Sequence, residues 1–144
     1  MPFRAAILSA AAALPLLCTP ATAQVSDSQL IGMMGLTDVS VKDKQMQHGR
    51  ELRGRLADGT RIEAEFRSND ELEEIESKDG SFPISLIGPL LPDAVKANPS
   101  FPHGATLRKL EFDGKIELEG RTADGRRFEA EFSQDGSLLD FDTD

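Results

Sequence analysis

The stretch ELRGRLADGTRIEAEF at residues 51–66 returns as ELEGRTADGRRFEAEF at residues 117–132. Extended without gaps to residues 76 and 142, the two copies share 13 identities in 26 aligned positions. This repeat constrains the fold more than composition does, because both copies must be able to adopt the same local structure. We therefore expect the chain to contain one structural unit twice.

Both copies carry the pattern of a β-hairpin. Apolar and charged residues alternate on each side of an Asp-Gly pair, as in strands with one buried face. A two-residue turn would place Leu52 opposite Glu65, whereas a three-residue turn places Leu52 opposite Ala64. We predict the three-residue turn, with Gly59 in the left-handed conformation, because it sets apolar opposite apolar. The same rule predicts the pairs Gly54–Ile62, Leu56–Thr60, Leu118–Ala130 and Gly120–Phe128, with Gly125 in the role of Gly59.

Further strands and a short helix flank each hairpin in the sequence. The expected strands cover residues 39–46, 72–76, 106–112 and 138–142, and the expected helices cover residues 26–35 and 90–97. A four-stranded sheet cannot bury its apolar face alone, so each unit needs a helix and a neighbour. We therefore predict an α+β fold of two tandem repeats, each a short helix followed by a four-stranded antiparallel meander, with the helices on one face of the sheet. Repeat 1 would span residues 24–80 and repeat 2 residues 81–144.

Residues 1–23 have the features of a secretory signal peptide. Arg4 precedes an apolar run at residues 5–17, and small residues lead to an expected cleavage site after Ala23. The apolar run is shorter than the roughly 20 residues that a membrane-spanning helix needs. The pattern predicts a periplasmic or secreted protein with no membrane insertion after cleavage.

Cleavage would also change the charge and the cysteine content. The full chain has 16 basic and 25 acidic residues, so the loss of Arg4 leaves a formal charge of −10. Neither nucleic acid nor an anionic membrane is an expected partner of such an acidic chain. Cys18, the only cysteine, would be removed too, so no disulfide is expected. A lipidated Cys18 is disfavoured because Leu17 stands where lipoproteins carry a small residue.

The order of helix, strands and a hairpin of the form G-R-x-x-D-G-x-x-x-E-x-x-F resembles the PepSY family. The second repeat carries the resemblance most clearly, at Leu118, Gly120, Asp124, Gly125, Phe128, Glu129, Asp135, Gly136 and Asp142. The resemblance implies an exported module of the kind found in peptidase propeptides and as free periplasmic proteins, implicated in holding peptidases inactive. The tandem arrangement is also similar to secreted β-lactamase inhibitor proteins, whose sheet grips an enzyme.

The predicted register creates like-charge pairs on the solvent side of each hairpin. It sets Arg55 opposite Arg61, Arg121 opposite Arg127, Glu51 opposite Glu65 and Glu117 opposite Glu131. Such pairs are mildly destabilising unless diagonal contacts, Arg55 to Glu63 and Arg121 to Glu129, offset them. Two interpretations stay open: a solvated, cross-braced surface, or a recognition face that is basic near the turns and acidic further down. The candidate protein-binding residues are Arg55, Arg61, Glu63, Arg121, Arg127 and Glu129.

The sequence offers little for catalysis or for a cofactor. The Glu pairs at 63 and 65 and at 129 and 131 could exchange protons only if their pKa values differed, and nothing nearby predicts that. His48 and His103 stand without neighbouring ligands, so we expect no transition-metal site. The tail at residues 140–144 spaces three aspartates like the first half of a calcium loop, but the later ligands are missing.

We therefore predict a non-enzymatic exported module, without a cofactor, that binds another exported protein such as a peptidase or other hydrolase and inhibits or regulates it. The alternative is an acidic envelope protein that binds a cation or small ligand. The oligomeric state stays open, although edge strands invite pairing between chains.

Overall fold

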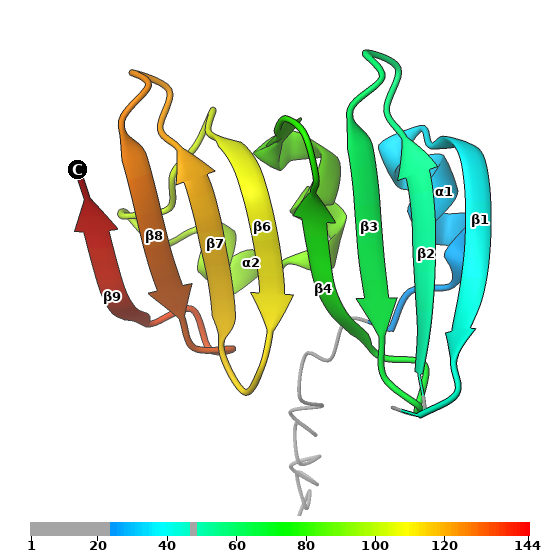
Figure 1. The fold of residues 1–144 in the computed structure, drawn as a ribbon. Coiled ribbons are helices and arrows are strands. Elements are labelled where there is room, and N and C mark those ends of the chain that lie inside the picture. Colours follow the sequence, from blue (N-terminus) through cyan, green and yellow to red (C-terminus); the bar gives the residue numbers. More distant parts are fainter. Residues whose placement is uncertain (1–23, 47–48) are drawn as a thin grey trace, which may run out of the picture.

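The computed structural model describes residues 24–46 and 49–144. The predicted signal peptide, Cys18 and His48 lie outside the described residues. The strands form one antiparallel sheet in the order β1-β2-β3-β4-β6-β7-β8-β9, with the short β5 paired to β6 (Figure 1). Their bounds are β1 Thr37–Lys44, β2 Gly49–Arg55, β3 Arg61–Phe66, β4 Leu72–Ser77, β5 Phe82–Pro83, β6 Thr106–Phe112, β7 Ile116–Arg121, β8 Arg127–Phe132 and β9 Leu138–Thr143.

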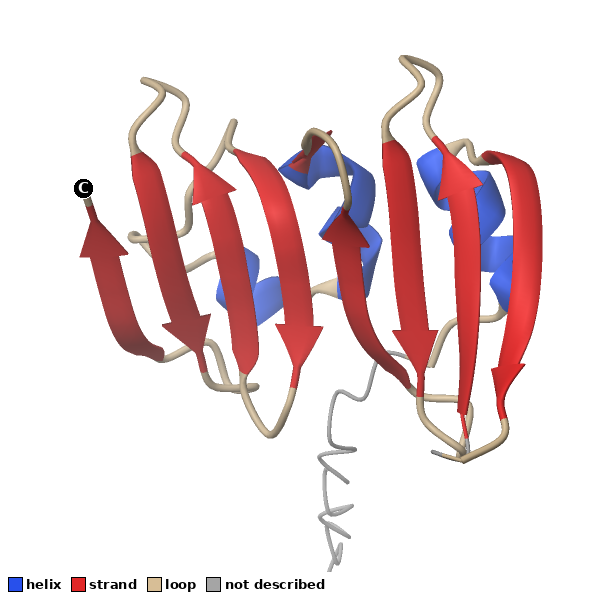
Figure 2. Cartoon of the chain, viewed as in Figure 1, coloured by secondary structure: helices blue, strands red, loops and turns tan. Residues whose placement is uncertain are grey.

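Three helical segments lie behind the sheet in the view of Figure 2: α1 Asp27–Met34, the 3-10 helix η1 Ile84–Leu90 and α2 Asp93–Lys96. α1 begins at a capping box, in which Ser26 Oγ accepts a hydrogen bond from the Gln29 amide at 3.1 Å. In return the Gln29 side chain accepts one from the Ser26 amide at 2.9 Å. α1 ends at Gly35, whose φ of 64° is favourable for glycine.

The predicted α+β fold of two repeats is wrong. The regular secondary structure of the described residues is mostly strand, in one nine-stranded sheet, and the helices are only 8, 7 and 4 residues long. The helix expected at residues 90–97 shortens to α2 because Pro89 and Pro92 prevent a regular helix from extending backwards. β4 pairs directly with β6, so the two copies continue as one sheet. The boundary between residues 80 and 81 stays a prediction.

The predicted hairpin register is confirmed in both copies. Leu52 pairs with Ala64 and Gly54 with Ile62 in the first, and the second has the corresponding pairs. The Gly59 amide donates to the Leu56 carbonyl at 2.9 Å, and Gly59 has a φ of 88°. Gly125 has the same φ and closes the second turn in the same way. The hairpins therefore follow from which apolar residues must share a face.

The buried core runs across both copies. Ile62, Ala64 and Phe66 are buried on the side of the sheet where the helices lie. At the junction between the copies, Ile75 of β4 pairs with Leu110 of β6, and both side chains are 0% exposed. One apolar interior is therefore shared by the two copies.

Arg50 fastens α1 to the sheet. Its guanidinium donates to Asp27 Oδ1 from Nη2 at 2.8 Å and from Nε at 3.0 Å. Its Cζ also lies 4.0 Å from the centroid of the Phe66 ring. This combination of charge-assisted hydrogen bonds and cation–π contact fixes the helix over the first hairpin.

Candidate functional site

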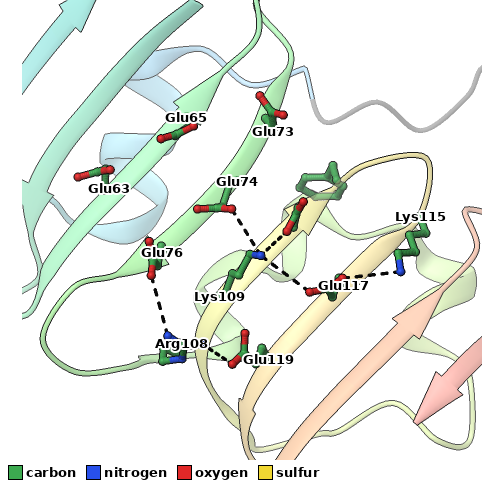
Figure 3. A network of polar contacts seen from close by, with 12 residues as sticks. Glu63, Glu65, Glu73, Glu74, Glu76, Arg108, Lys109, Lys115, Glu117 and Glu119 are labelled. Carbon is green, nitrogen blue, oxygen red and sulfur yellow. Dashed lines mark hydrogen bonds and ion pairs between the residues drawn. The ribbon is translucent and has the colours of Figure 1, made fainter. Parts of the chain in front are cut away.

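The side of the sheet away from the helices, which we call the outer face, is covered by charged side chains. Figure 3 shows its centre, where Lys109 Nζ lies 3.6 Å from Glu74 and 3.9 Å from Glu117 and forms an ion pair with Glu111. Burial raises the pKa of both Glu74 and Glu117, and the positive charge of Lys109 opposes this. Lys109 thus holds three carboxylates from three strands together where the copies meet.

In the first copy, the opposed arginines have acidic partners. Arg55 and Arg61 pair across β2 and β3, as the register predicted. Arg61 donates from its amide and from Nε to Asp79, at 2.7 and 2.9 Å, and these bonds lower the pKa of Asp79. Arg55 Nε lies 4.0 Å from Asp38, and its Nη1 donates to the Gly59 carbonyl at 3.1 Å. Flanking carboxylates therefore offset the repulsion between these two cations.

The second copy repeats the arginine pair without the acidic partners. Arg121 and Arg127 pair across β7 and β8, and Arg121 Nη1 donates to the Gly125 carbonyl at 2.9 Å. Within residues 24–46 and 49–144, neither guanidinium has a carboxylate oxygen within 4.0 Å. Thr37 faces Arg55 and Thr106 faces Arg121, but the next residue is Asp38 in one case and leucine in the other. The two copies therefore differ on the outer face: carboxylates lie beside the arginine pair of the first copy but not beside that of the second, within the described residues.

The predicted diagonal contacts from Arg55 to Glu63 and from Arg121 to Glu129 are not formed. Glu63 instead lies 3.3 Å from Arg53 Nε, directly across the strands, and 3.7 Å from Lys78 Nζ. In the second copy the position of Arg53 is taken by Glu119, which faces Glu129. Glu119 pairs with Arg108 of β6, which leaves Glu129 with no basic nitrogen within 4.0 Å in the described part of the chain. The change from a basic residue, Arg53, to an acidic one, Glu119, was not used in the sequence-based prediction, although the aligned copies show it.

The candidate residues line two separate hollows on the outer face. The first-copy hollow, of about 510 Å³, contains Arg55, Arg61 and Glu63 together with Asp38, Arg53 and Lys78. The second-copy hollow, of about 570 Å³, contains Arg121, Arg127 and Glu129 together with Arg108, Glu119 and Asp142. The structure therefore brings each predicted trio together but keeps the two trios in different hollows.

Two clusters of glutamate carboxylates lie on the outer face, one in each copy. Glu51, Glu63 and Glu65 have carboxylate oxygens within 4.8 Å of one another, and so do Glu117, Glu129 and Glu131. Basic groups already contact the first cluster: Lys44 Nζ lies 2.6 Å from Glu65, and Arg53 forms an ion pair with Glu51. In the second cluster Lys115 forms an ion pair with Glu131.

The remaining metal candidates from the sequence are not supported by the arrangement of their residues. Residues 138–143 form β9, so Asp140 and Asp142 lie along an extended strand, where alternate residues are about 6.6 Å apart, and do not curl around an ion. His103 packs edge-on against Phe101, with ring centroids 4.8 Å apart. Neither the segment with Asp140 and Asp142 nor the surroundings of His103 form a loop that could bind a cation.

The aromatic side chains also bear on binding. All Phe residues of the described chain are buried except Phe141, which is half-buried and stacks on Phe128 with centroids 6.0 Å apart. An exposed Phe that anchors a partner on the outer face is therefore not present among these residues. The outer face of the described residues is therefore charged and not aromatic.

Among the described residues, none of the helices has the length and apolar character that spanning a bilayer requires. The resemblance to PepSY domains stays a prediction that rests on the residues of the repeat. Comparisons with protein-family models and with curated protein sequences find no match for this chain.

Proposed function

We propose that this protein is an exported, non-enzymatic binding module that holds another exported protein against the outer face of its second copy. The observation that carries the proposal is the Arg121–Arg127 pair, which has no carboxylate oxygen within 4.0 Å among the described residues. The same pair in the first copy, Arg55 and Arg61, has acidic neighbours. A partner would have to displace these neighbours in the first copy, but it meets open charges in the second.

The chemistry of the second-copy hollow selects the partner. A carboxylate placed between Arg121 and Arg127 would relieve their repulsion and accept charge-assisted hydrogen bonds from both. Glu129 and Asp142 line the same hollow and are suited to a basic side chain. The proposed partner therefore presents an acidic and a basic side chain close together, and this complementarity sets its orientation more than its affinity.

A peptidase or another exported hydrolase is the partner class that we propose, with inhibition or regulation as the outcome. The support for this class is the resemblance of the repeat to PepSY domains. The charged outer face supports binding by electrostatic complementarity without choosing between enzyme classes.

A cation-binding envelope protein is the second candidate. It is favoured by Glu51, which is 8% exposed and has one carboxylate oxygen, Oε1, that is buried and accepts no hydrogen bond. Arg53 nevertheless lies against the same oxygen, so a cation would have to displace its guanidinium. Calorimetry with calcium tests this candidate: heat of binding that disappears in Glu51→Gln would support it, and the absence of heat would exclude it.

The main proposal is tested by retention of proteins from a periplasmic extract on immobilised protein. Arg121→Glu with Arg127→Glu reverses the pair in the second copy, and Arg55→Glu with Arg61→Glu is the matched control in the first. We expect the first variant to lose a protein that the unmodified chain and the control both retain. Thermal unfolding of both variants confirms that they are folded. Equal retention by both variants, or no specific retention by the unmodified chain, would overturn the proposal.

A further inference from the structure

Among the residues that the structure describes, the sheet ends in two edge strands, β1 and β9, each with one side that pairs with no other described strand. These edges carry the apolar surface of the described residues. The exposed large apolar side chains are Val39 and Val41 on β1, Leu138 and Leu139 on β9, and Met46 two residues beyond β1. Open edges with apolar side chains favour pairing with another strand.

The junction between β4 and β6 shows how this chain joins one unit to the next. β4 is the last strand of the first copy, and β6 is the first long strand of the second. They pair as Glu74–Glu111, Ile75–Leu110 and Glu76–Lys109. Ile75 and Leu110 are fully buried on the inner side, and Lys109 holds Glu74 at 3.6 Å on the outer side.

β9 corresponds to β4, and β1 corresponds to β6. The repeat aligns Glu74, Ile75 and Glu76 with Asp140, Phe141 and Asp142. On the other side, Val41 pairs with Leu52 as Leu110 pairs with Leu118, the equivalent of Leu52. Lys42 of β1 therefore corresponds to Glu111 of β6, and Ser40 of β1 corresponds to Lys109 of β6.

From this correspondence we propose that a second copy of the chain adds to the sheet edge to edge, with β9 of one copy against β1 of the next. The internal junction gives the register: Asp140 opposite Lys42, Phe141 opposite Val41 and Asp142 opposite Ser40. β1 and β9 run in opposite directions in Figure 1, so a second copy in the same orientation makes an antiparallel pair, as elsewhere in the sheet.

The side chains of the two edges are complementary in this register. On the outer face, the acidic Asp140 meets the basic Lys42, where the internal junction has two glutamates facing each other. On the inner face, the half-buried Phe141 meets Val41, which is 49% exposed in the single chain. Backbone hydrogen bonds would complete both edges. Pairing of two β9 strands would instead bring aspartates together, and pairing of two β1 strands would bring lysines together.

The contact is heterologous, because it uses different surfaces of the two copies. One β1 and one β9 stay free after each addition, so the assembly grows or closes into a ring. This inference does not rest on the proposed function, since it is argued from the strand edges and the internal junction, although Asp142 of β9 also lines the second-copy hollow.

The test uses an equal mixture of the exported protein in normal and ¹⁵N-labelled form, treated with a carbodiimide that joins carboxylates to amines in contact. We expect a Lys42–Asp140 cross-link between labelled and unlabelled copies, and a mass in solution that rises with concentration. A protein that stays monomeric at all concentrations, or cross-links that join only like edges, would overturn the proposal.

Charge reversal provides a second test that does not depend on the cross-linker. Lys42→Glu alone and Asp140→Lys alone should each weaken association about tenfold, because an opposite-charge pair becomes a like-charge pair. The chain that carries both changes should associate as the unmodified one does. Arg126→Glu, in the β7–β8 turn, is the control and should have no effect. Failure of the double variant to recover association would contradict the proposed register.

Discussion

Ile75 and Leu110 face each other across β4 and β6, the strands at which the two copies of the repeat meet, and neither side chain is exposed. The pair joins two short meanders into one sheet with one apolar interior. Because one unit of about 60 residues would be only marginally stable alone, the junction stabilises both copies by enlarging the core that they share.

Truncation at this junction should therefore be costly. We expect Ile75→Ala and Leu110→Ala each to lower the free energy of unfolding by about 2–5 kcal/mol, the usual range for a large-to-small change in a core. Because the side chains are neighbours, the double variant should lose a different amount from the sum, with a coupling of about 0.5–3 kcal/mol. Denaturant unfolding of the four chains measures this. Strict additivity would show that the two residues do not share a core.

Two glycines provide a matched pair of substitutions. A Cβ at Gly120 would lie 2.0 Å from the Thr106 carbonyl oxygen, whereas one at Gly32 in α1 would meet nothing within 4 Å. Gly120→Ala should therefore destabilise the protein by about 1–3 kcal/mol through overpacking. Gly32→Ala should stabilise it by up to about 1 kcal/mol, because alanine favours a helix interior. A melting temperature that does not fall for Gly120→Ala would contradict the packing between β6 and β7, and one that falls for Gly32→Ala would contradict the open space beside α1.

The two arginine pairs should respond differently to truncation. Arg127→Ala removes one of two facing cations that have no acidic partner in the described part of the chain, so stability should stay the same or rise by a few tenths of a kcal/mol. Arg61→Ala removes the ion pair with Asp79, which is partly exposed, and should cost about 0.2–1 kcal/mol. Denaturant midpoints of the two variants test this. A larger loss from Arg127→Ala than from Arg61→Ala would show that the second pair is compensated.

The turn between β8 and β9 should make stability depend on pH in acid. Hydrogen bonds from Ser133 Oγ and from the Ser137 amide lower the pKa of Asp135 from 3.8 to about 2. Because the folded-state pKa lies below the unfolded one, the stabilising contribution is complete above about pH 4 and is lost as the pH falls toward 2. The contribution is small, since the carboxylate is exposed to solvent.

Unfolding of the unmodified chain and of Asp135→Asn between pH 6 and pH 2 measures this contribution. The difference between the two chains should shrink as the pH falls. A constant difference over the whole range would show that Asp135 titrates normally.

The hairpins could be predicted from the sequence because their determinants are local. A slip of one residue would bury Glu65 in place of Ala64, so alternation and Gly59 are sufficient to fix the register. The capped helix α1 could be found in the same way, from Ser26 and Gly35. These features depend on residues within a few positions of one another.

The features that could not be predicted depend on contacts between distant residues. The pairing of β4 with β6 leaves no local pattern, so the sequence predicts an α+β fold of two repeats where the structure has one nine-stranded sheet. The contact of Arg61 with Asp79 depends on how the chain turns after β4. The exchange of Arg53 for Glu119 was available in the aligned copies, but its meaning required the strand neighbours that the sheet supplies.

The junction is the feature on which the shared core and the proposed edge pairing both depend. Nuclear Overhauser contacts between the backbone protons of Ile75 and Leu110 measure it most directly. Strong cross-strand contacts between these two residues, with slow exchange of the amides around them, are the predicted result. Absence of these contacts, with the two copies unfolding in separate transitions, would contradict the account.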